Sequence, residues 1–278
     1  MNPDDFKYLA DTVRHRSGIV LTPEKMYLVE SRLLPLARSR GLNDLGTLIA
    51  SMRRNDLGVV AAVVEAMTTN ESLFFRDARP FDQFKRLVLP KLLQARSAGR
   101  VIRIWSAACS SGQEPYSLAM LLAEEGPKLA GWSIDILGTD LSKAMVERAR
   151  SGTYSQFEIQ RGVPQPMLAK YFVRDGDKWT VAPQIRAMVR FREFNLLDEP
   201  AALGTFDVVL CRNVLIYFDQ PTKAKILASI AGRLPADGTL YLGGSETVFG
   251  ITDRFEPIPA ERGIYRLTTV PAAQRAAA

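Results

Sequence analysis

The chain has 278 residues, of which 47% are hydrophobic and 24% charged, a composition ordinary for a globular protein with a large core. Lys and Arg exceed Asp and Glu by 36 − 30 = +6, so we expect an acidic partner, whose kind the charge alone does not specify. The two cysteines, Cys109 and Cys211, fit neither a disulfide framework nor a metal-ligand cluster, so we expect no bound metal. The sequence shows no signal peptide and no apolar run long enough to cross a bilayer, which predicts a cytoplasmic protein without membrane insertion.

Residues 1–68 are predicted to form an all-α module of short amphipathic helices. The dipeptide Asn2-Pro3 is typical of a helix start, and apolar residues then recur at helical spacing. In the second helix, Pro35 predicts a kink or a break. A third helix is expected to open at Asn43 or Asp44, and a fourth apolar stripe follows it.

Residues 69–79 are predicted to connect this module to a second domain. They read T-N-E-S-L-F-F-R-D-A-R, so polar residues precede large apolar residues and then charges. Phe74 and Phe75 suit a loop that fills a domain interface, and such a loop can also reach a ligand. Both alternatives stay open at this point.

From residue 80 to about 268, strand-like and helix-like patterns alternate, which predicts an α/β sheet. The dipeptide Asp-Gly at Asp175–Gly176, between strand-like runs at 170–174 and 178–181, is a hairpin signal. We therefore expect a small antiparallel β-subdomain at about 170–192, for which Met188–Phe191 is a candidate third strand; Val189–Phe194 is also typical of a strand in the main α/β pattern. The Ala-rich tail, 271–278, is expected to be disordered.

The stretch from Val101 to Pro115 reads V-I-R-I-W-S-A-A-C-S-S-G-Q-E-P, which predicts a strand, a turn of small residues and a helix. Such a turn brings backbone and helix-terminal N–H groups close to a nucleotide-like ligand. The glycine pattern G-x-G-x-x-G is absent, and the Glu114 carboxylate would repel a phosphate. A cofactor with a cationic amino-acid end, such as S-adenosylmethionine, suits Glu114 better. The alternative is that Glu114 only stabilises the helix N-terminus.

Polar residues follow the other predicted strands as well. Asp140 ends the second strand, Asn195 follows a later one, and Arg212 and Asn213 follow the strand that ends at Cys211. Each residue alone is common turn chemistry. Because the carboxyl ends of parallel strands meet at one edge of a sheet, their combination predicts a ligand site there.

Several motifs together resemble the CheR family of chemotaxis receptor methyltransferases, in order from about residue 5 to 268. The motifs are T-T-N-E-S-L-F-F-R-D (68–77), I-W-S-A-A-C-S-S-G-Q-E-P-Y-S (104–117), T-D (139–140), N-L-L (195–197) and C-R-N-V-L-I-Y-F (211–218). The resemblance implies a Rossmann-like, class I S-adenosylmethionine-dependent methyltransferase domain at 80–270 that carries the small antiparallel β-subdomain. It also implies that the all-α domain at 1–68 docks on the receptor and that the connector at 69–79 reaches the cofactor.

The resemblance further assigns roles to residues that match the family's motifs. Arg76 and Tyr217 would act at the reacting centre, Arg76 by steering the acceptor carboxylate. The implied cofactor-binding residues are Asn70, Ser72, Arg76, Glu114, Asp140, Asn195, Leu196, Arg212 and Asn213. Within this set, Glu114 would face the methionine part, Asp140 the ribose, and Asn195 with Leu196 the adenine.

The implied reaction is methyl transfer from S-adenosylmethionine to glutamate carboxylates of chemoreceptors, which gives methyl esters and S-adenosylhomocysteine. A nucleic-acid methyltransferase is an alternative because the chain is basic, but Arg212-Asn213-Val214 stands where an N/D-P-P-Y-type turn would be expected. A non-catalytic signalling scaffold is a further alternative. We expect a monomer whose partner is the cytoplasmic helical region of the receptor, with no nucleic acid bound.

Basic residues of the helical module are candidates for docking on the acidic receptor helices, although a solvated surface is the more common fate of such charges. They are Lys25, Arg32, Arg38, Arg40, Arg53 and Arg54. Relatives that bind a receptor C-terminal pentapeptide have a longer, Gly-rich loop in the β-subdomain hairpin. The short loop at 175–177 therefore predicts weak or no pentapeptide tethering.

Overall fold

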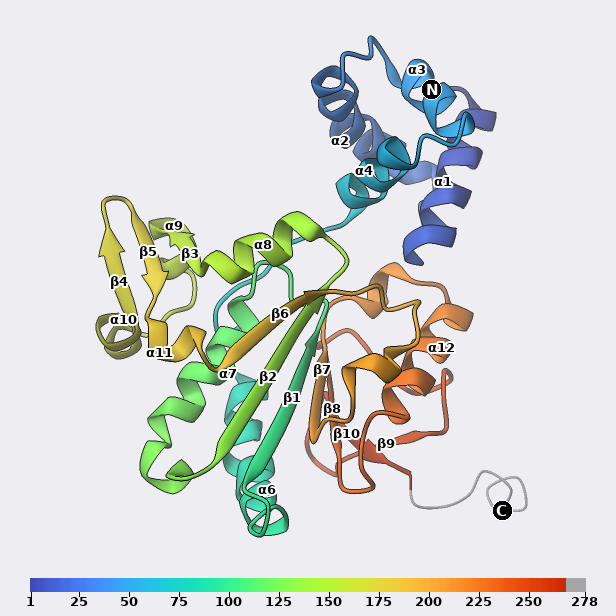
Figure 1. Cartoon of the computed structure of the whole chain (residues 1–278). Coiled ribbons are helices and arrows are strands. Elements are labelled where there is room, and N and C mark those ends of the chain that lie inside the picture. Colours follow the sequence, from blue (N-terminus) through green and yellow to red (C-terminus); the bar gives the residue numbers. More distant parts are fainter. Residues whose placement is uncertain (269–278) are drawn as a thin grey trace, which may run out of the picture. The chain divides into compact units, whose positions relative to one another are not determined.

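The computed structural model describes residues 1–268, which form two units (Figure 1). The first unit comprises residues 1–69 together with 217–223, and the second comprises 70–216 and the described chain from 224 onward. The segment at 217–223 was expected in the α/β domain, so the domain boundary is more interleaved than the sequence pattern predicts. The tail at 271–278, for which disorder was predicted, lies outside the described residues.

The first unit is helical, as predicted. Its elements are α1 (Pro3–Ser17), the 3₁₀ turn η1 (Pro23–Lys25), α2 (Met26–Ser39), α3 (Leu45–Arg53) and α4 (Leu57–Met67). The Asn2 side chain accepts from Asp5 N and starts α1, and Asp44 forms a capping box that starts α3. Helix α2 continues through Pro35, so of the predicted kink or break the structure excludes the break.

The core of the first unit lies between apolar stripes of these helices. Its fully buried side chains include Leu9, Val13, Val29, Leu33, Leu48, Ile49, Met52 and Val63. The segment at 217–223 joins this unit through its backbone: Val20 N donates to Tyr217 O over 2.9 Å, and Ile19 forms a bridge with Phe218. Arg14 also forms an ion pair with Asp219. The chain that follows the strand ending at Cys211 is therefore shared between the units.

The second unit contains a main sheet with the order β6-β2-β1-β7-β8-β10-β9. The strands are β1 (Val101–Ala107), β2 (Ser133–Asp140), β6 (Val189–Glu193), β7 (Val208–Cys211), β8 (Thr239–Leu242), β9 (Phe255–Pro257) and β10 (Ile264–Leu267). The pairs from β6 to β8 are parallel, whereas β10 is antiparallel to β8 and β9. The α/β sheet is confirmed, and the carboxyl ends of β6, β2, β1 and β7 share one edge (Figure 1).

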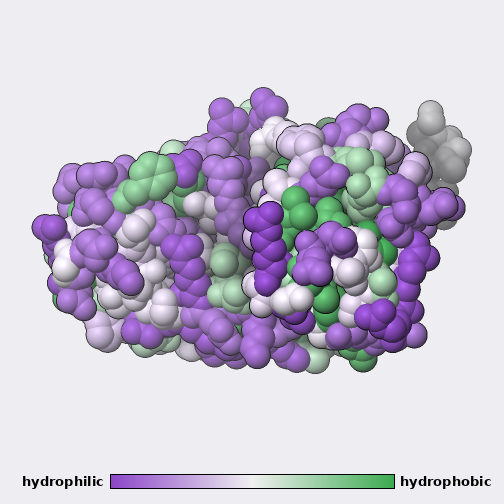
Figure 2. Space-filling model, turned by 90° about the horizontal axis from the view of Figure 1, so that it is seen from above, coloured by the Kyte–Doolittle hydropathy of each residue, from purple (hydrophilic) through white to green (hydrophobic). Residues whose placement is uncertain are grey.

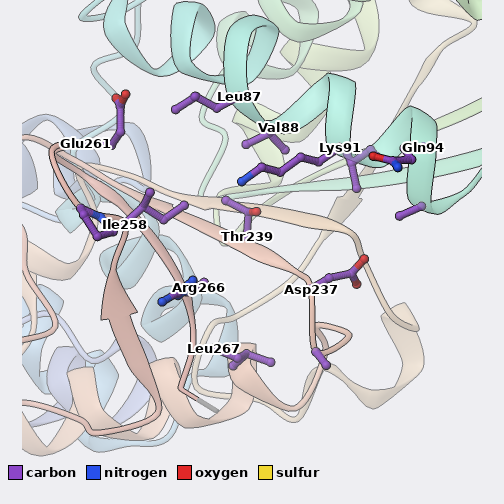
Figure 3. A pocket seen from close by; sticks show the side chains of 14 residues that line it. Leu87, Val88, Lys91, Gln94, Asp237, Thr239, Ile258, Glu261, Arg266 and Leu267 are labelled. Atoms are coloured by element: carbon purple, nitrogen blue, oxygen red, sulfur yellow. The ribbon is translucent and has the colours of Figure 1, made fainter.

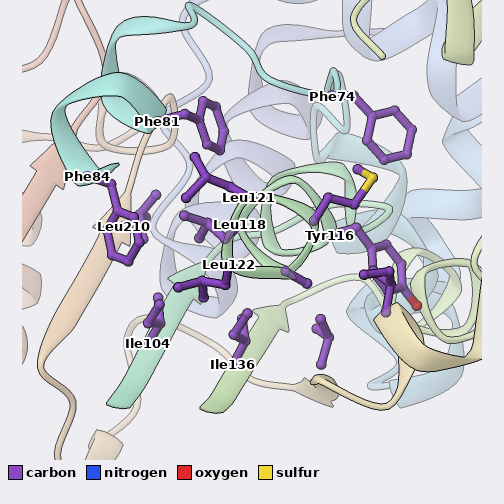
Figure 4. Close-up of a cluster of buried hydrophobic side chains, with 14 of the residues drawn as sticks. Phe74, Phe81, Phe84, Ile104, Tyr116, Leu118, Leu121, Leu122, Ile136 and Leu210 are labelled. Carbon is purple, nitrogen blue, oxygen red and sulfur yellow. The ribbon is translucent and has the colours of Figure 1, made fainter. Parts of the chain in front are cut away.

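Helices and short turns link and flank these strands. They are α5 (Arg79–Gln83), the π-helical turn η2 (Phe84–Val88), α6 (Leu89–Ala95), α7 (Gln113–Glu124), η3 (Gly126–Leu129), α8 (Lys143–Ser151), α9 (Gln156–Gln160), α10 (Gln165–Tyr171), α11 (Pro183–Arg186), η4 (Pro200–Leu203), η5 (Leu215–Tyr217) and α12 (Gln220–Ala231). Helix α7 is buried along almost its whole length, since it packs between the sheet and the segment from Phe81 to Phe84 (Figure 4). Its start, at the β1–α7 turn, is thereby fixed.

A small antiparallel sheet with the order β3-β5-β4 forms the β-subdomain. Its strands are β3 (Thr153–Ser155), β4 (Phe172–Asp175) and β5 (Lys178–Val181). The hairpin at Asp175–Gly176 is confirmed, with Gly176 at φ +60°. The strand expected at Val189–Phe194 is confirmed as β6, which pairs with β2 in the main sheet. The placement of Met188–Phe191 as the third strand of the β-subdomain is therefore wrong, and β3 takes that place.

The connector packs tightly against the β-subdomain. Phe74 is 1% exposed, and its ring makes edge-on contacts with Tyr154 at 4.9 Å and Phe172 at 5.5 Å between ring centroids. A Cβ added to Gly162 would lie 2.0 Å from the Phe74 carbonyl oxygen, so only glycine fits there. Phe74 thus belongs to the core of the second unit, where it joins the connector to the β-subdomain.

Hydrophilic residues cover most of the face shown in Figure 2, and hydrophobic residues appear on it in patches. In residues 1–268, no helix combines the length and the apolar character needed to cross a bilayer.

Gly162→Ala should destabilise the protein by about 1–3 kcal/mol, because the new methyl group overpacks against the Phe74 backbone. Gly99→Ala is the matched control, since a Cβ there meets no atom within 4 Å. Urea unfolding of both variants measures the difference. An equal change in both would contradict the close packing of Gly162 on the connector.

Candidate active site

The β1–α7 turn is a tightly wound loop of small residues. Ala108 and Ser110 have φ of 56° and 51°, and Gly112 has φ of 91°. A Cβ at Gly112 would lie 2.9 Å from the Cβ of Ala149, so this position requires glycine for space as well as for its backbone conformation. No side chain caps the N-terminus of α7 at Gly112, which leaves backbone N–H groups at this edge of the sheet.

Tyr154 of the β-subdomain also fixes this turn. Its buried hydroxyl donates to Ser111 O over 2.6 Å. Burial raises the pKa of the Tyr154 phenol well above its usual value, so the group remains protonated and able to donate. The sequence pattern did not single out Tyr154, because nothing near it in sequence indicates this distant partner.

The Glu114 carboxylate is held by two other segments. Ser106 Oγ of β1 donates to Glu114 Oε1 over 2.8 Å, and Arg212 Nη1 donates to Oε2 over 2.7 Å. The Glu114 side chain is 13% exposed. Neither interpretation of Glu114 from the sequence included this ion pair, which orients the carboxylate at the edge of the sheet.

Arg212 joins strand β7 to helix α7 and the connector. Its side chain is 2% exposed, and besides binding Glu114 it donates from Nη2 to Arg76 O at 3.0 Å and to Asp77 Oδ2 at 2.7 Å. Its Nε is buried and has no hydrogen-bond partner among the described residues. Asp77 was not singled out by the sequence pattern, although its charge beside Arg76 was the available signal.

Asp140 ties the end of β2 to the β1–α7 turn. Its Oδ2 accepts from Ser110 N over 2.7 Å, and its Oδ1 accepts from Ser142 N over 2.9 Å. The residue is 6% exposed. The predicted position of Asp140 at a strand end is confirmed, and its carboxylate lies next to the turn that carries Ser110.

The connector runs along the same turn. Ser110 Oγ donates to Asn70 O over 2.7 Å, and Phe75 N donates to Ser117 Oγ of α7 over 2.9 Å. Phe75, Asp77 and Ala78 all have positive φ, which is costly for residues other than glycine and is tolerated where surrounding contacts enforce it. Arg76 follows in this segment, and its Nη1 donates to Glu71 O over 3.2 Å.

The remaining predicted residues follow neighbouring strands. Asn195 and Leu196 are half-buried after β6, and Asn195 Oδ1 accepts from Leu197 N over 3.1 Å. Asn213 follows Arg212 after β7, and Ser72 is half-buried within the connector. Direct contacts thus join Arg76 and Glu114 to Arg212, whereas Asn70 and Asp140 both contact Ser110 of the β1–α7 turn. Tyr217, in contrast, belongs to the first unit.

A separate cavity of about 720 Å³ lies beside α6, β8 and β10 (Figure 3). Three of its charged lining residues form ion pairs with residues outside the lining: Asp237 with Arg96, Glu261 with Arg86, and Arg266 with Glu256. None of the predicted cofactor residues, all of which lie in the described chain, line this cavity. It is therefore distinct from the candidate site.

The models of two domains of one protein family together match nearly the whole chain. "CheR methyltransferase, SAM binding domain" matches residues 70–264, and "CheR methyltransferase, all-alpha domain" matches residues 4–68. The chain belongs to the CheR methyltransferase family. It is thus an S-adenosylmethionine-dependent methyltransferase, and the predicted fold class, with a Rossmann-like domain preceded by an all-α domain, is confirmed.

Relatives in this family are similar over almost their full length. Chemotaxis protein methyltransferase 1 of Pseudomonas aeruginosa is 44% identical over 94% of this chain and 96% of its own. Chemotaxis protein methyltransferase Cher2 of Pseudomonas putida is 42% identical over the same shares. Chemotaxis protein methyltransferase 1 of Vibrio cholerae is 39% identical over 96% of this chain and 98% of its own.

The residues at the sheet edge of this CheR methyltransferase fit S-adenosylmethionine. The buried Arg212 Nε, which lacks a partner among residues 1–268, is a donor suited to a carboxylate, and Glu114 is an acid suited to a cationic amino-acid end. A pyrophosphate cofactor fits less well, because the Glu114 carboxylate would repel it and the usual glycine pattern is absent. Across the described part of the chain, no group of three or more His, Cys, Asp or Glu residues has the arrangement of a metal site.

Arg212→Ala should lower the free energy of unfolding by about 3–5 kcal/mol, because it leaves the largely buried Glu114 carboxylate without its cationic partner. Arg266→Ala is the control: Arg266 pairs with Glu256 but is 56% exposed, so its loss should cost about 1 kcal/mol or less. Urea unfolding measures both. Similar losses in the two variants would show that the Arg212 cluster does not hold the site together.

Both cysteines should resist a maleimide reagent in the folded enzyme at about pH 8. Burial raises the pKa of the Cys109 and Cys211 thiols well above the usual value, so the reactive thiolate is scarce. Mass spectrometry should find both residues labelled only after denaturation. Rapid labelling of Cys211 in the native protein would instead indicate a reactive thiol beside Arg212.

Proposed function

We propose that this enzyme transfers the methyl group of S-adenosylmethionine to glutamate side-chain carboxylates of chemoreceptors and so forms methyl esters. The observation that supports this proposal most directly is the cluster around the buried Arg212, which pairs with Glu114 and with the exposed Asp77 and holds the connector and its Arg76 at the cofactor edge of the sheet. The names of the similar chemotaxis protein methyltransferases also support it.

The residues proposed to hold the cofactor come from the connector and from successive strand ends. They are Asn70, Ser72, Arg76, Glu114, Asp140, Asn195, Leu196, Arg212 and Asn213. Glu114 and Arg212 offer opposite charges, which suit the ammonium and carboxylate groups of the methionine part. Asp140 is proposed to bind the ribose, and Asn195 with Leu196 to border the adenine. When bound, S-adenosylmethionine supplies an electrophilic methyl group, and its transfer leaves S-adenosylhomocysteine.

The acceptor needs no general base, because a glutamate side chain is already ionised at neutral pH. The protein has to align the acceptor and exclude water, which can supply about 7–11 kcal/mol at the upper end. Arg76 is proposed to steer the acceptor, since a guanidinium binds a carboxylate through two parallel hydrogen bonds. Tyr217 is proposed to lie near the acceptor as well.

The structure narrows the set of basic residues available for receptor docking. Arg32 instead donates to Met67 O and Thr68 O at the end of α4, at 2.9 and 2.7 Å. Arg53 pairs with Asp5. The side chains of Arg38 and Arg54 are exposed and bind no described residue, so we propose that these two dock on acidic receptor helices.

Arg40 and Lys25 are also partly engaged within the helical unit. Arg40 Nη2 donates to Gly58 O over 3.2 Å, and Lys25 Nζ donates to Val20 O over 3.4 Å.

The hairpin of the β-subdomain is as short as the sequence indicates, and this supports the proposal that the enzyme lacks a pentapeptide tether. We propose that it acts in the cytoplasm as a monomer.

Incubation with methyl-labelled S-adenosylmethionine and a cytoplasmic chemoreceptor fragment tests the proposed function. We expect base-labile label on the fragment, which identifies a carboxyl methyl ester. Label on added RNA would favour the nucleic-acid alternative, and no transfer despite cofactor binding would favour a scaffold.

Arg76→Ala should reduce turnover on the receptor fragment on the order of 100-fold, because the acceptor loses its alignment. Arg79→Ala, an exposed arginine three positions later, should leave turnover nearly unchanged. Calorimetry with S-adenosylhomocysteine measures the product affinity of both variants and so separates a loss of cofactor binding from a loss of acceptor alignment. Full activity of Arg76→Ala with intact binding would remove the steering role.

A further inference from the structure

Glu246 lies in the G-G-S-E segment (243–246) that follows β8, and no predicted site residue belongs to this segment. The residue is only 8% exposed, although it carries an acidic side chain. No lysine or arginine is its partner in the described contacts; backbone N–H groups surround it instead. The reason that this carboxylate is buried therefore lies in the backbone of the loops that it contacts.

The carboxylate binds two successive loops at the cofactor edge of the sheet. Its Oε1 accepts from Val214 N at 2.9 Å and Leu215 N at 2.7 Å, and its Oε2 accepts from Asn213 N at 2.8 Å and Gly243 N at 2.6 Å. Converging N–H groups form an anion-binding concavity, and here the protein's own side chain occupies it. The loop after β7 is thereby fastened to the loop after β8.

The backbone around this concavity follows an uncommon path. Asn213 has φ of 60°, a left-handed conformation that asparagine adopts more readily than most other non-glycine residues. A Cβ on Gly243 would lie 2.6 Å from Glu246 Oε2 and 2.9 Å from Asn213 N, so a larger residue would push the two loops apart. Glycine at 243 and an acid at 246 therefore act together on Asn213.

We propose that Glu246 is a positioning residue for methyl transfer, which acts by fixing the backbone of residues 213–215 and hence the orientation of Asn213 beside Arg212. This inference rests on the proposed function, in which Asn213 contributes to cofactor binding. Arg212 is already fixed by its own ion pairs with Glu114 and Asp77, but nothing in those pairs determines how the chain turns after it. Glu246 supplies that constraint.

An amide cannot replace the carboxylate at this place. A carboxylate offers acceptors on both oxygens, whereas the amide of glutamine has one acceptor oxygen and turns its NH₂ group toward backbone donors. Glu246→Gln keeps the size of the side chain but leaves only one oxygen to accept hydrogen bonds from the backbone N–H groups. Glu125→Gln is a matched control, because Glu125 is 6% exposed but lies at the other end of α7 and pairs with Lys85 and Lys128.

Amide hydrogen exchange of the loop tests the inference without an activity assay. In Glu246→Gln, exchange of the amides of residues 213–215 should quicken at least about tenfold, and the affinity for S-adenosylhomocysteine should fall about tenfold. In Glu125→Gln, both should stay near the wild-type values. Unchanged exchange and affinity in a folded Glu246→Gln would overturn the inference.

A second pair of variants covers the case in which Glu246→Gln fails to fold. Gly243→Ala should disturb the same loop from the opposite side, whereas Gly244→Ala should not, since a Cβ there meets nothing within 4 Å. We expect kcat on the receptor fragment to fall at least about tenfold in Gly243→Ala and little in Gly244→Ala. Equal kcat in the two would count against the inference.

The two proposals fail in different ways. If wild-type enzyme transfers no label to the receptor fragment, the proposed function fails, while loop exchange and S-adenosylhomocysteine affinity still decide the role of Glu246. If the wild type is active but Glu246→Gln matches it in kcat, exchange and affinity, only the positioning role fails.

Discussion

The buried guanidinium of Arg212 is the constraint on which the site depends. Removing such a charge from water is expensive, and the cost is offset only because Glu114 and Asp77 lie within hydrogen-bond distance of it. These partners come from helix α7 and from the connector, while Arg212 itself follows strand β7. One cation therefore fixes three segments that are far apart in sequence, and the cofactor edge of the sheet has a defined shape only when all of them are in place.

Much of the fold follows from local patterns, and the errors have a common cause. The cap at Asp44 and the hairpin at Gly176 were predictable because their determinants lie within a few residues. The extended segment that begins near Met188 was a candidate for both sheets, and only its place in the main sheet is correct. Alternating burial of Val189 and Phe191 fits either sheet, since strand periodicity identifies an extended segment and not its pairing partner.

The site shows the same division between local and distant determinants. Asp140 was recognisable because it ends strand β2, and Glu114 because it lies at the start of the helix after the β1 turn, where ligands of α/β sheets bind. Glu246 was not, since an acid after Gly-Gly-Ser resembles ordinary turn chemistry until the N–H groups of the β7 loop are seen around it. Arg32 shows the reverse case: it was a candidate for receptor docking, and only the structure shows that its guanidinium donates to the carbonyl groups at the end of α4.

The contact between Gly162 and the Phe74 carbonyl bears on how this enzyme can be recombined with its relatives. Residue 162 has to lack a side chain because the backbone at Phe74 passes so close to it, although the two residues lie far apart in the sequence. The connector and the β-subdomain therefore form one inheritable block. A chimera that exchanges the β-subdomain for that of a relative has to take the connector from the same parent, even though a crossover between them looks harmless in a sequence alignment.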